Sequence, residues 1–212
     1  MATEGGRGRP GDGGWTVSAA PARLKKAAEA SVRRLGVDAT GLYQLHEPDP
    51  AVPWAESVGA LRELLDAGTI RAAGVSDVTT AQIRQAHQIL GDGLVCVQNQ
   101  YSPAVRDSEP ELRPSERPGP AFLPWSPLGG ISRSPLDGPS GPVSVGTAFH
   151  RVAAGRGVSP QQIALAWLLP RDAPGTGSRP ASITDSAGAA ELTLNAWELR
   201  ELKALPPNGA GL

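Results

Sequence analysis

Apolar residues recur at helical spacing in three stretches of the first half of the chain. The first stretch begins at Pro21, which suits the first turn of a helix, and stops at Gly36. A second contains Trp54 and stops at Gly68, and a third follows Thr79, whose hydroxyl can cap a helix. The other positions of these apolar faces are Leu24, Ala27, Ala28, Ser31, Val32, Leu35, Val58, Leu61, Leu65, Ile83, Ala86, Ile89 and Leu90. The pattern predicts three helices.

Short apolar runs without helical spacing lie between and after these helices and are typical of buried strands. They cover residues 41–46, 70–75, 94–98 and 121–125. Their ends lie roughly 23 to 29 residues apart, which leaves room for one strand and one helix, the repeat of a parallel sheet. Because a polar turn and a helix follow each short strand, we predict an α/β protein of the (β/α)8 TIM-barrel type.

The second half of the chain carries further helices and two interruptions. Ser159, followed by Pro160 and Gln162, forms a capping box, and Asn195 with Glu198 opens another helix. Residues 103–120 contain five prolines where a barrel helix is expected, so any helix there should be short or distorted. Residues 132–144, rich in Ser, Pro and Gly, are interpreted as a surface loop.

Composition excludes several classes of protein. The 212 residues include 26 Gly and 21 Pro, and the net charge of −1 favours neither nucleic acid nor an anionic membrane. A single cysteine, Cys96, excludes an intramolecular disulfide framework and a multi-cysteine zinc site. No apolar run approaches the ~20 residues that span a bilayer. We expect one cytoplasmic domain over 1–212, with a Gly-rich loop over 1–20 and a flexible tail over 206–212.

The Gly-rich loop contains a G-x-G-x-x-G spacing at Gly6, Gly8 and Gly11. A dinucleotide-binding role would require a strand before the motif and a helix that opens at the third glycine. Pro10 and Asp12 instead extend the loop. We therefore assign no nucleotide-binding role to this motif.

Several conspicuous residues have plain structural interpretations. Cys96 lies between two valines of a predicted strand and is expected to be inert core. Six polar residues are expected to be solvated, namely His87, His150, Lys25, Lys26, Arg33 and Arg34. Three tryptophans are expected to pack against the core, namely Trp54, Trp167 and Trp197.

Candidate chemistry lies where the predicted strands end, because working residues of a β/α barrel gather at the carboxyl ends of its strands. These positions hold His46, Ser76 with Asp77, Gln98, and Trp125 with Ser126. Imidazole and amide groups form directed hydrogen bonds, and an indole offers a stacking face. The set suits a polar carbonyl substrate and a flat heteroaromatic ring.

Four sequence blocks around these positions closely resemble the aldo-keto reductase superfamily, in the family's order. They are LYQLHEPD (42–49), GTIRAAGVSD (68–77), VQNQYS (97–102) and FLPWSPLGG (122–130). The resemblance extends over roughly residues 1–205. It implies a β/α barrel that uses NADPH (NADP) and no metal. Such an oxidoreductase reduces a small aldehyde or ketone and acts on neither nucleic acid nor membrane.

The resemblance also implies roles for individual residues. His46 matches the histidine that orients the substrate carbonyl. Ser76, Asp77 and Gln98 match the side chains that hold the nicotinamide carboxamide, although the family normally has Asn at the position of Asp77. The remaining matches are Trp125, which would stack on the nicotinamide, Ser126, Leu128 and Gly130 along the pyrophosphate, and Thr176 and Ser178 near the ribose phosphate.

Departures from the family pattern point to impaired chemistry. Residues 2–6 resemble the family's third barrel strand, so we expect the first two β/α units, with the catalytic Asp and Tyr, to be absent. Glu4 occupies the position of the family's lysine, which lowers the pKa of that tyrosine; a carboxylate acts in the opposite direction. The last unit is shortened around residues 168–174, and 181–185 differs from the segment that contacts adenosine.

Three functional hypotheses follow from this sequence. The first is an NADPH-dependent reductase with impaired activity, and the second is a non-catalytic paralogue or fragment that acts, if at all, as a binding or interaction module. In the third, the start codon is misassigned and upstream DNA encodes the missing units. An incomplete barrel would expose strand edges, so self-association through these edges is also expected.

Overall fold

The computed structural model describes residues 1–11, 14–112, 119–129, 131, 146–169 and 180–202. The chain divides into two compact units. The first contains residues 1–99 and 114–121, and the second contains residues 100–113 and 122–212. Each unit is described by itself below. The predicted loop at 132–144, the tail at 206–212, and Gly130, Thr176 and Ser178 lie outside the described residues.

Parallel strands form the centre of the first unit. Within this unit the sheet order is β1 (Ala2–Gly5), β4 (Leu42–Leu45), β5 (Ala73–Ser76) and β6 (Leu94–Gln100), whereas β7 (Ala121–Trp125) lies mostly in the second unit. The pairs β1–β4, β4–β5 and β5–β6 are parallel. This confirms the predicted α/β class with parallel strands. The strand expected from Ile70 starts later, at Ala73, since Ile70 forms only an isolated bridge with Thr40.

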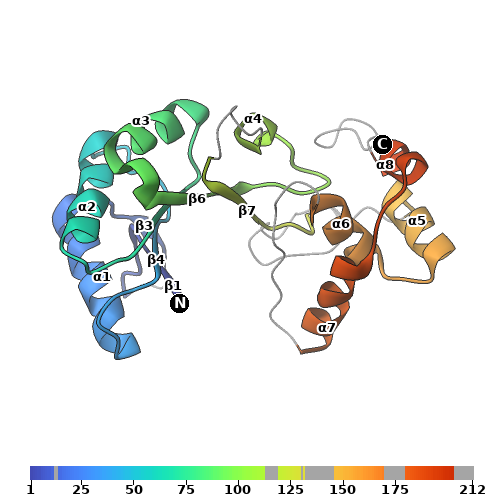
Figure 1. Cartoon of the computed structure of the whole chain (residues 1–212), viewed down its shortest axis with the longest axis horizontal. Coiled ribbons are helices and arrows are strands. Elements are labelled where there is room, and N and C mark those ends of the chain that lie inside the picture. The colour runs from blue at the N-terminus through green and yellow to red at the C-terminus, as the bar shows by residue number, and fades with distance from the viewer. Residues whose placement is uncertain (12–13, 113–118, 130, 132–145, 170–179, 203–212) are drawn as a thin grey trace. The chain divides into compact units, whose positions relative to one another are not determined.

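Helices follow the strands in the predicted alternation. They are α1 (Pro21–Leu35), α2 (Trp54–Asp66) and α3 (Thr80–Leu90), with a 3-10 turn η1 at Gly91–Gly93. In Figure 1, α1, α2 and α3 lie along one side of the strands. The side chain of Thr79 accepts a hydrogen bond from the backbone amide of Gln82, and Oε1 of Gln82 accepts one from the backbone amide of Thr79, which completes a capping box. Gly36 ends α1 in the left-handed conformation.

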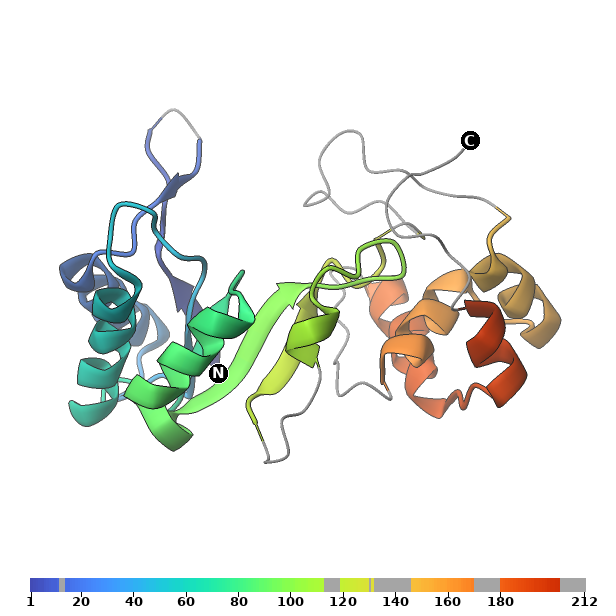
Figure 2. The same cartoon turned by 90° about the horizontal axis from the view of Figure 1, so that it is seen from above.

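The Gly-rich segment, predicted to be a loop, contains a small antiparallel hairpin. Its strands are β2 (Arg7–Gly8) and β3 (Thr16–Val17), which Figure 2 shows extending beyond the helices of this unit. Although β1 precedes Gly6, no helix opens at Gly11, because the next helix begins at Pro21. The geometry needed for a dinucleotide-binding glycine motif is therefore not present in the described residues.

The second unit is mainly helical. Its helices are α4 (Glu109–Leu112), α5 (Ala148–Arg156), α6 (Pro160–Leu168), α7 (Pro180–Gly188) and α8 (Ala196–Leu202), with a 3-10 turn η4 at Ala189–Glu191. In the part of the proline-rich segment that the structure describes, the helix is the four-residue α4, in keeping with the expected short helix. Trp167 packs at the centre, stacked on Tyr101 at a ring distance of 5.7 Å and edge-on to Phe149 at 6.0 Å.

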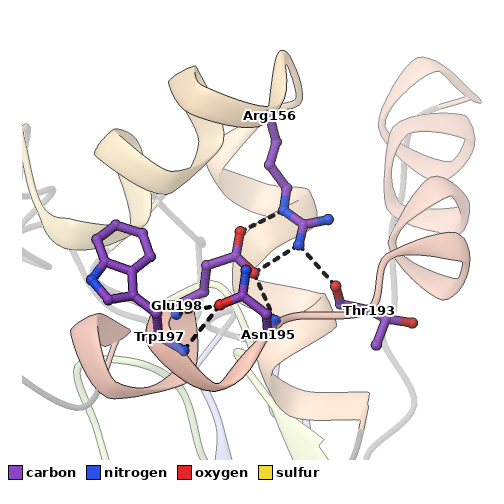
Figure 3. A network of polar contacts seen from close by, with 5 residues as sticks. All are labelled: Arg156, Thr193, Asn195, Trp197 and Glu198. Carbon is purple, nitrogen blue, oxygen red and sulfur yellow. Dashed lines mark hydrogen bonds and ion pairs between the residues drawn. The ribbon is translucent and has the colours of Figure 1, made fainter.

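Glu198 joins α5 to the start of α8 (Figure 3). It is 5% exposed and accepts hydrogen bonds from Arg156 Nε at 2.6 Å and Nη2 at 2.7 Å. Asn195 Oδ1 accepts from the amide of Glu198, and Glu198 Oε2 accepts from the amide of Asn195, so the predicted capping box is formed. The packing role predicted for Trp197 is wrong, because this residue is 58% exposed. Glu198 and Leu202 instead face the interior.

Candidate functional site

Polar side chains meet at the carboxyl ends of the first unit's strands. The strand register places Glu4 opposite Gln44, and Ser76 opposite Gln98. His46 follows β4 directly, and its amide donates to the carbonyl of Gly5 at the end of β1. We call Glu4, Gln44, His46, Ser76 and Gln98 the Glu4 cluster.

Glu4 and His46 form the closest pair in this cluster. His46 Nδ1 lies 2.9 Å from Glu4 Oε2, and the two side chains are 36% and 34% exposed. The hydrogen bond between them raises the pKa of His46 above its ordinary value and lowers the pKa of Glu4, in both cases against partial desolvation. The pair therefore favours a carboxylate and an imidazolium.

Amide groups complete the surroundings of Glu4. Gln44 Nε2 donates to Glu4 Oε1 at 3.0 Å, and Gln98 Nε2 approaches the same oxygen at 3.5 Å. Ser76 Oγ donates to Gln98 Oε1 at 3.3 Å. Each of these bonds favours the ionised form of Glu4 directly or orients a group that does. Sequence reasoning placed Glu4 at the lysine position but did not assign Gln44 any part in the site.

Cys96 lies beneath this cluster and is a buried structural thiol, as expected. Its Sγ donates to Gln44 Oε1 at 3.1 Å, and burial raises its pKa to about 11. Gly74 stands between Gln44 and Cys96 in the strand register. A Cβ at Gly74 would lie 2.4 Å from Cys96 Sγ and 3.0 Å from Gln44 Cγ, so only glycine permits this contact.

The segment after β5 is held in a strained conformation. Asp77 has a φ of 53°, and its amide donates to the carbonyl of Gln98 at 2.9 Å. Asn99 fixes the backbone of Val78, the residue after Asp77. Its Oδ1 accepts from the amide of Val78 at 3.0 Å, and its Nδ2 donates to the carbonyl of Val78 at 2.7 Å. Asn99 thus positions Ser76 and Asp77. Sequence reasoning gave it no role, although it lies within the 97–102 block.

The other predicted site residues described here belong to the second unit. Trp125 ends β7, and Ser126 follows with a φ of 49°. Ser126 is buried, and its hydroxyl has no hydrogen-bond partner within the described part of the chain. Leu128 follows in the turn that the amide of Gly129 closes onto the carbonyl of Ser126. A strained backbone and a buried hydroxyl without a partner, both at Ser126, are typical of a loop that binds a ligand.

The first unit's side chains fit a carboxamide in their chemistry. A carboxamide offers one carbonyl acceptor and one amino donor. Ser76 and Gln98 can donate to the carbonyl, and the carboxylate of Asp77 can accept from the amino group. No group of three or more His, Cys, Asp or Glu side chains that could hold a metal occurs in the described residues.

Polar groups at the ends of parallel strands, with helices after each strand, define a protein of the β/α-barrel class. The chain belongs to the aldo/keto reductase family, whose model matches residues 3–206. It is 32% identical to pyridoxine 4-dehydrogenase of Escherichia coli over 217 residues, covering 97% of this chain and 71% of that protein. It is 36% identical to an uncharacterized oxidoreductase of Schizosaccharomyces pombe, covering 81% of this chain and 52% of the relative.

Solved structures agree with this family and with the predicted fold. A thermostable aldo-keto reductase, in complex with the inhibitor epalrestat, is similar with a TM-score of 0.73 and 26% identity, covering 88% of this chain and 67% of that one. An aldo/keto reductase from Brucella melitensis shares the fold, with a TM-score of 0.69 at 24% identity and coverage of 86% and 67%. The barrel-type α/β prediction is confirmed.

Two further facts bear on the whole protein. The chain spans about half the length of some curated relatives, as with the 52% of the Schizosaccharomyces pombe protein and the 54% of a Mycobacterium bovis oxidoreductase. Among the helices in the described ranges, none is long and apolar enough to cross a membrane.

Proposed function

We propose that this chain is a cytoplasmic, NADPH-dependent reductase of small aldehydes or ketones whose activity is far below that of a family member with lysine at the position of Glu4. Membership of the family and the carboxamide-compatible set of Ser76, Asp77 and Gln98 support the cofactor. The resemblance adds Trp125, Ser126, Leu128, Gly130, Thr176 and Ser178 as cofactor ligands. NADPH would supply the hydride for the carbonyl carbon.

The contact between Glu4 and His46 is the observation that carries this proposal. It holds Nδ1 of His46 and favours the imidazolium, which keeps a hydrogen on Nε2 for the substrate oxygen. His46 can therefore still orient a carbonyl. A carboxylate at the lysine position would, however, raise the pKa of a neighbouring phenol rather than lower it. Loss of an effective general acid typically costs about 10²–10⁴-fold in rate.

The test is NADPH consumption with a panel of aromatic aldehydes and quinones, together with pyridoxal because of the relative named for pyridoxine. We expect slow turnover that His46→Ala abolishes. His87→Ala is the matched control, since His87 is exposed on α3 and should leave the rate unchanged. Turnover at the rate of an ordinary family member, or full activity in His46→Ala, would contradict the proposal.

The same contact favours a second function, a non-catalytic binding module. If the hydrogen bond to Glu4 prevents His46 from contacting a substrate, the chain would bind NADPH and reduce no substrate. Direct titration of NADPH separates the two hypotheses. Binding without turnover favours the module, binding with slow turnover favours the weak reductase, and the absence of binding contradicts both.

Self-association is a further part of this proposal. β1 stands at one end of the sheet order, and Ala2 and Glu4 on it are exposed. An open strand edge is a template for pairing with another chain. Sedimentation of the purified chain tests this, and a monomer at micromolar concentration would contradict it.

A further inference from the structure

A cavity of about 530 Å³ lies in the first unit between the hairpin segment and α1. Gly6, Arg7 and Ser18 line it from the hairpin side, and Arg23 and Lys26 line it from the helix. Ala22, Ala27 and Ala30 form the rest of the helical wall. The cavity is thus bounded by small apolar side chains, a hydroxyl and three cations.

Two of the three cations that line this cavity have no carboxylate partner among the described residues. No carboxylate is among its lining residues. Arg7 pairs with Glu47 outside the lining, whereas neither Arg23 nor Lys26 makes an ion pair with any residue that the structure describes. Two cations therefore line the cavity without an ion pair in the described part of the chain, a charge distribution that attracts an anion.

The start of α1 adds to this field. The helix has 15 residues, its N-cap Ala20 provides no capping side chain, and its first turn has no acidic residue. Ala22, in that first turn, lines the cavity. Pro21 has no N–H, and the amides of Arg23 and Leu24 donate to the carbonyl of Ala20, so the amide of Ala22 and the positive end of the helix dipole add to the attraction that Arg23 and Lys26 exert on an anion.

Gly6 shapes the floor of the cavity. Its φ of 102° is one that side chains rarely adopt, and a Cβ there would lie 2.8 Å from Leu45 Cδ1. The chain can thus turn sharply from β1 into the hairpin, which brings Arg7 opposite Arg23 and Lys26 as a lining residue. The glycine contributes its conformation, and the side chains contribute the charge.

We infer that this cavity binds the phosphate group of a small phosphate monoester. A phosphate monoester carries a charge of about −1.5 to −2 at pH 7 and three acceptor oxygens, which match two free cations, the shared Arg7 and the Ser18 hydroxyl. A volume of about 530 Å³ falls in the range of small-molecule sites. The alanine wall provides apolar surface for the organic part. The inference does not depend on the reductase activity.

Calorimetric titration with 4-nitrophenyl phosphate, inorganic phosphate and neutral 4-nitrophenol tests the assignment. The ester should bind more tightly than inorganic phosphate, and 4-nitrophenol should not bind measurably. Equal affinity for the ester and for inorganic phosphate would overturn the assignment of an organic phosphate, since the alanine wall would then contribute nothing.

Two adjacent lysines provide a matched pair of variants. Lys26 lines the cavity, whereas Lys25 pairs with Glu63 on α2. Arg23→Gln with Lys26→Gln should weaken binding of the ester by at least about tenfold, the usual loss for a charge-assisted hydrogen bond. Lys25→Gln should change it less than about twofold. Both replaced residues of the double variant are exposed, so its thermal melt should match the wild type. Unchanged binding in the double variant, or an equal loss in Lys25→Gln, would refute the site.

Discussion

Replacement of Gly74 by alanine should destabilise the first unit and disturb the layer beneath the Glu4 cluster. Gly74 lies on β5 between Gln44 on β4 and Cys96 on β6, with each neighbour in register. An added Cβ would lie 2.4 Å from Cys96 Sγ and 3.0 Å from Gln44 Cγ. Non-bonded heavy atoms pack best at about 3.5–4.0 Å, so the overlap with sulfur is about 1 Å.

The size of the effect follows from how little the surroundings can move. Gly74 is paired with a strand on each side, although the register against β6 shifts between Ala73 and Gly74, and both Gln44 and Cys96 are buried. Extra volume in a packed core typically costs about 1–3 kcal/mol. We expect Gly74→Ala to lower the free energy of unfolding by that amount, measured by urea denaturation with circular dichroism and fluorescence.

Gly59→Ala is the control for this substitution. Gly59 lies inside α2, and nothing is within 4 Å of a Cβ built there. The same added methyl group should therefore stabilise the protein by about 0.5–1 kcal/mol through helix propensity. The two variants add the same atoms and should change stability in opposite directions.

Cys96→Ala should rescue the damaged variant, because it removes the sulfur that the new methyl group meets. The double variant with Gly74→Ala should be more stable than the sum of the two single effects by about 1 kcal/mol or more. If Gly74→Ala is neutral, or if the two substitutions are additive, the contact does not constrain this layer and the reasoning is refuted.

Three further predictions concern individual side chains. Glu4→Gln should lower the pKa of His46 in an NMR titration. In the wild type, the ion pair should contribute its full stabilisation between pH 4.5 and 6.5. This contribution should be lost at lower pH as Glu4 is protonated, and at higher pH as His46 is deprotonated through its raised pKa. An unchanged pKa of His46 in the variant contradicts the contact. Cys96, with its pKa of about 11, should react with a disulfide reagent at pH 8 about 100-fold more slowly than an unperturbed thiol, and rapid labelling of the native protein would exclude its burial. Asn195→Ala should cost about 1 kcal/mol of unfolding free energy through loss of the cap, whereas Trp197→Ala should stay within about 0.5 kcal/mol, and the reverse order would contradict the structure.

Local signals in the sequence predicted most helices and strands. Pro21 and Gly36 mark both ends of α1, and Thr79 with Gln82 forms the cap of α3, because these effects act within a few residues. The start of β5 was less accurate. Ile70 is buried like a strand residue, but the ladder between it and Ala73 is interrupted, and the apolar pattern contains no signal for such a gap.

Periodicity alone also misassigned Trp197. The prediction took Trp197, a large aromatic residue on a helix, to lie on the buried face of that helix. The buried pair is instead Glu198 and Leu202, four residues apart, because Arg156 from α5 neutralises the carboxylate and allows it to face inward. A partner 42 residues away is invisible to a local pattern.

The candidate site was predictable as a set of residues and not as a network. The sequence placed His46, Ser76 and Gln98 at strand ends, and the structure brings Ser76 to 3.3 Å from Gln98. Their roles toward cofactor and substrate stay predictions. The contact of Glu4 with His46 depends on the register of β1 against β4, which no motif within either strand specifies.

The surroundings of Glu4 favour a carboxylate at this position. Cys96 donates to Gln44 Oε1, so the amino group of Gln44 is directed at Glu4, and His46 directs a second donor to the same side chain. A lysine at this position would place a second cation beside the imidazolium of His46 and would offer Gln44 Nε2 no acceptor. The charge at residue 4 is therefore coupled to the orientation of Gln44 and the protonation of His46. It follows that Glu4→Lys alone would leave the amino group of the buried Gln44 without its present acceptor and would lower the pKa of His46.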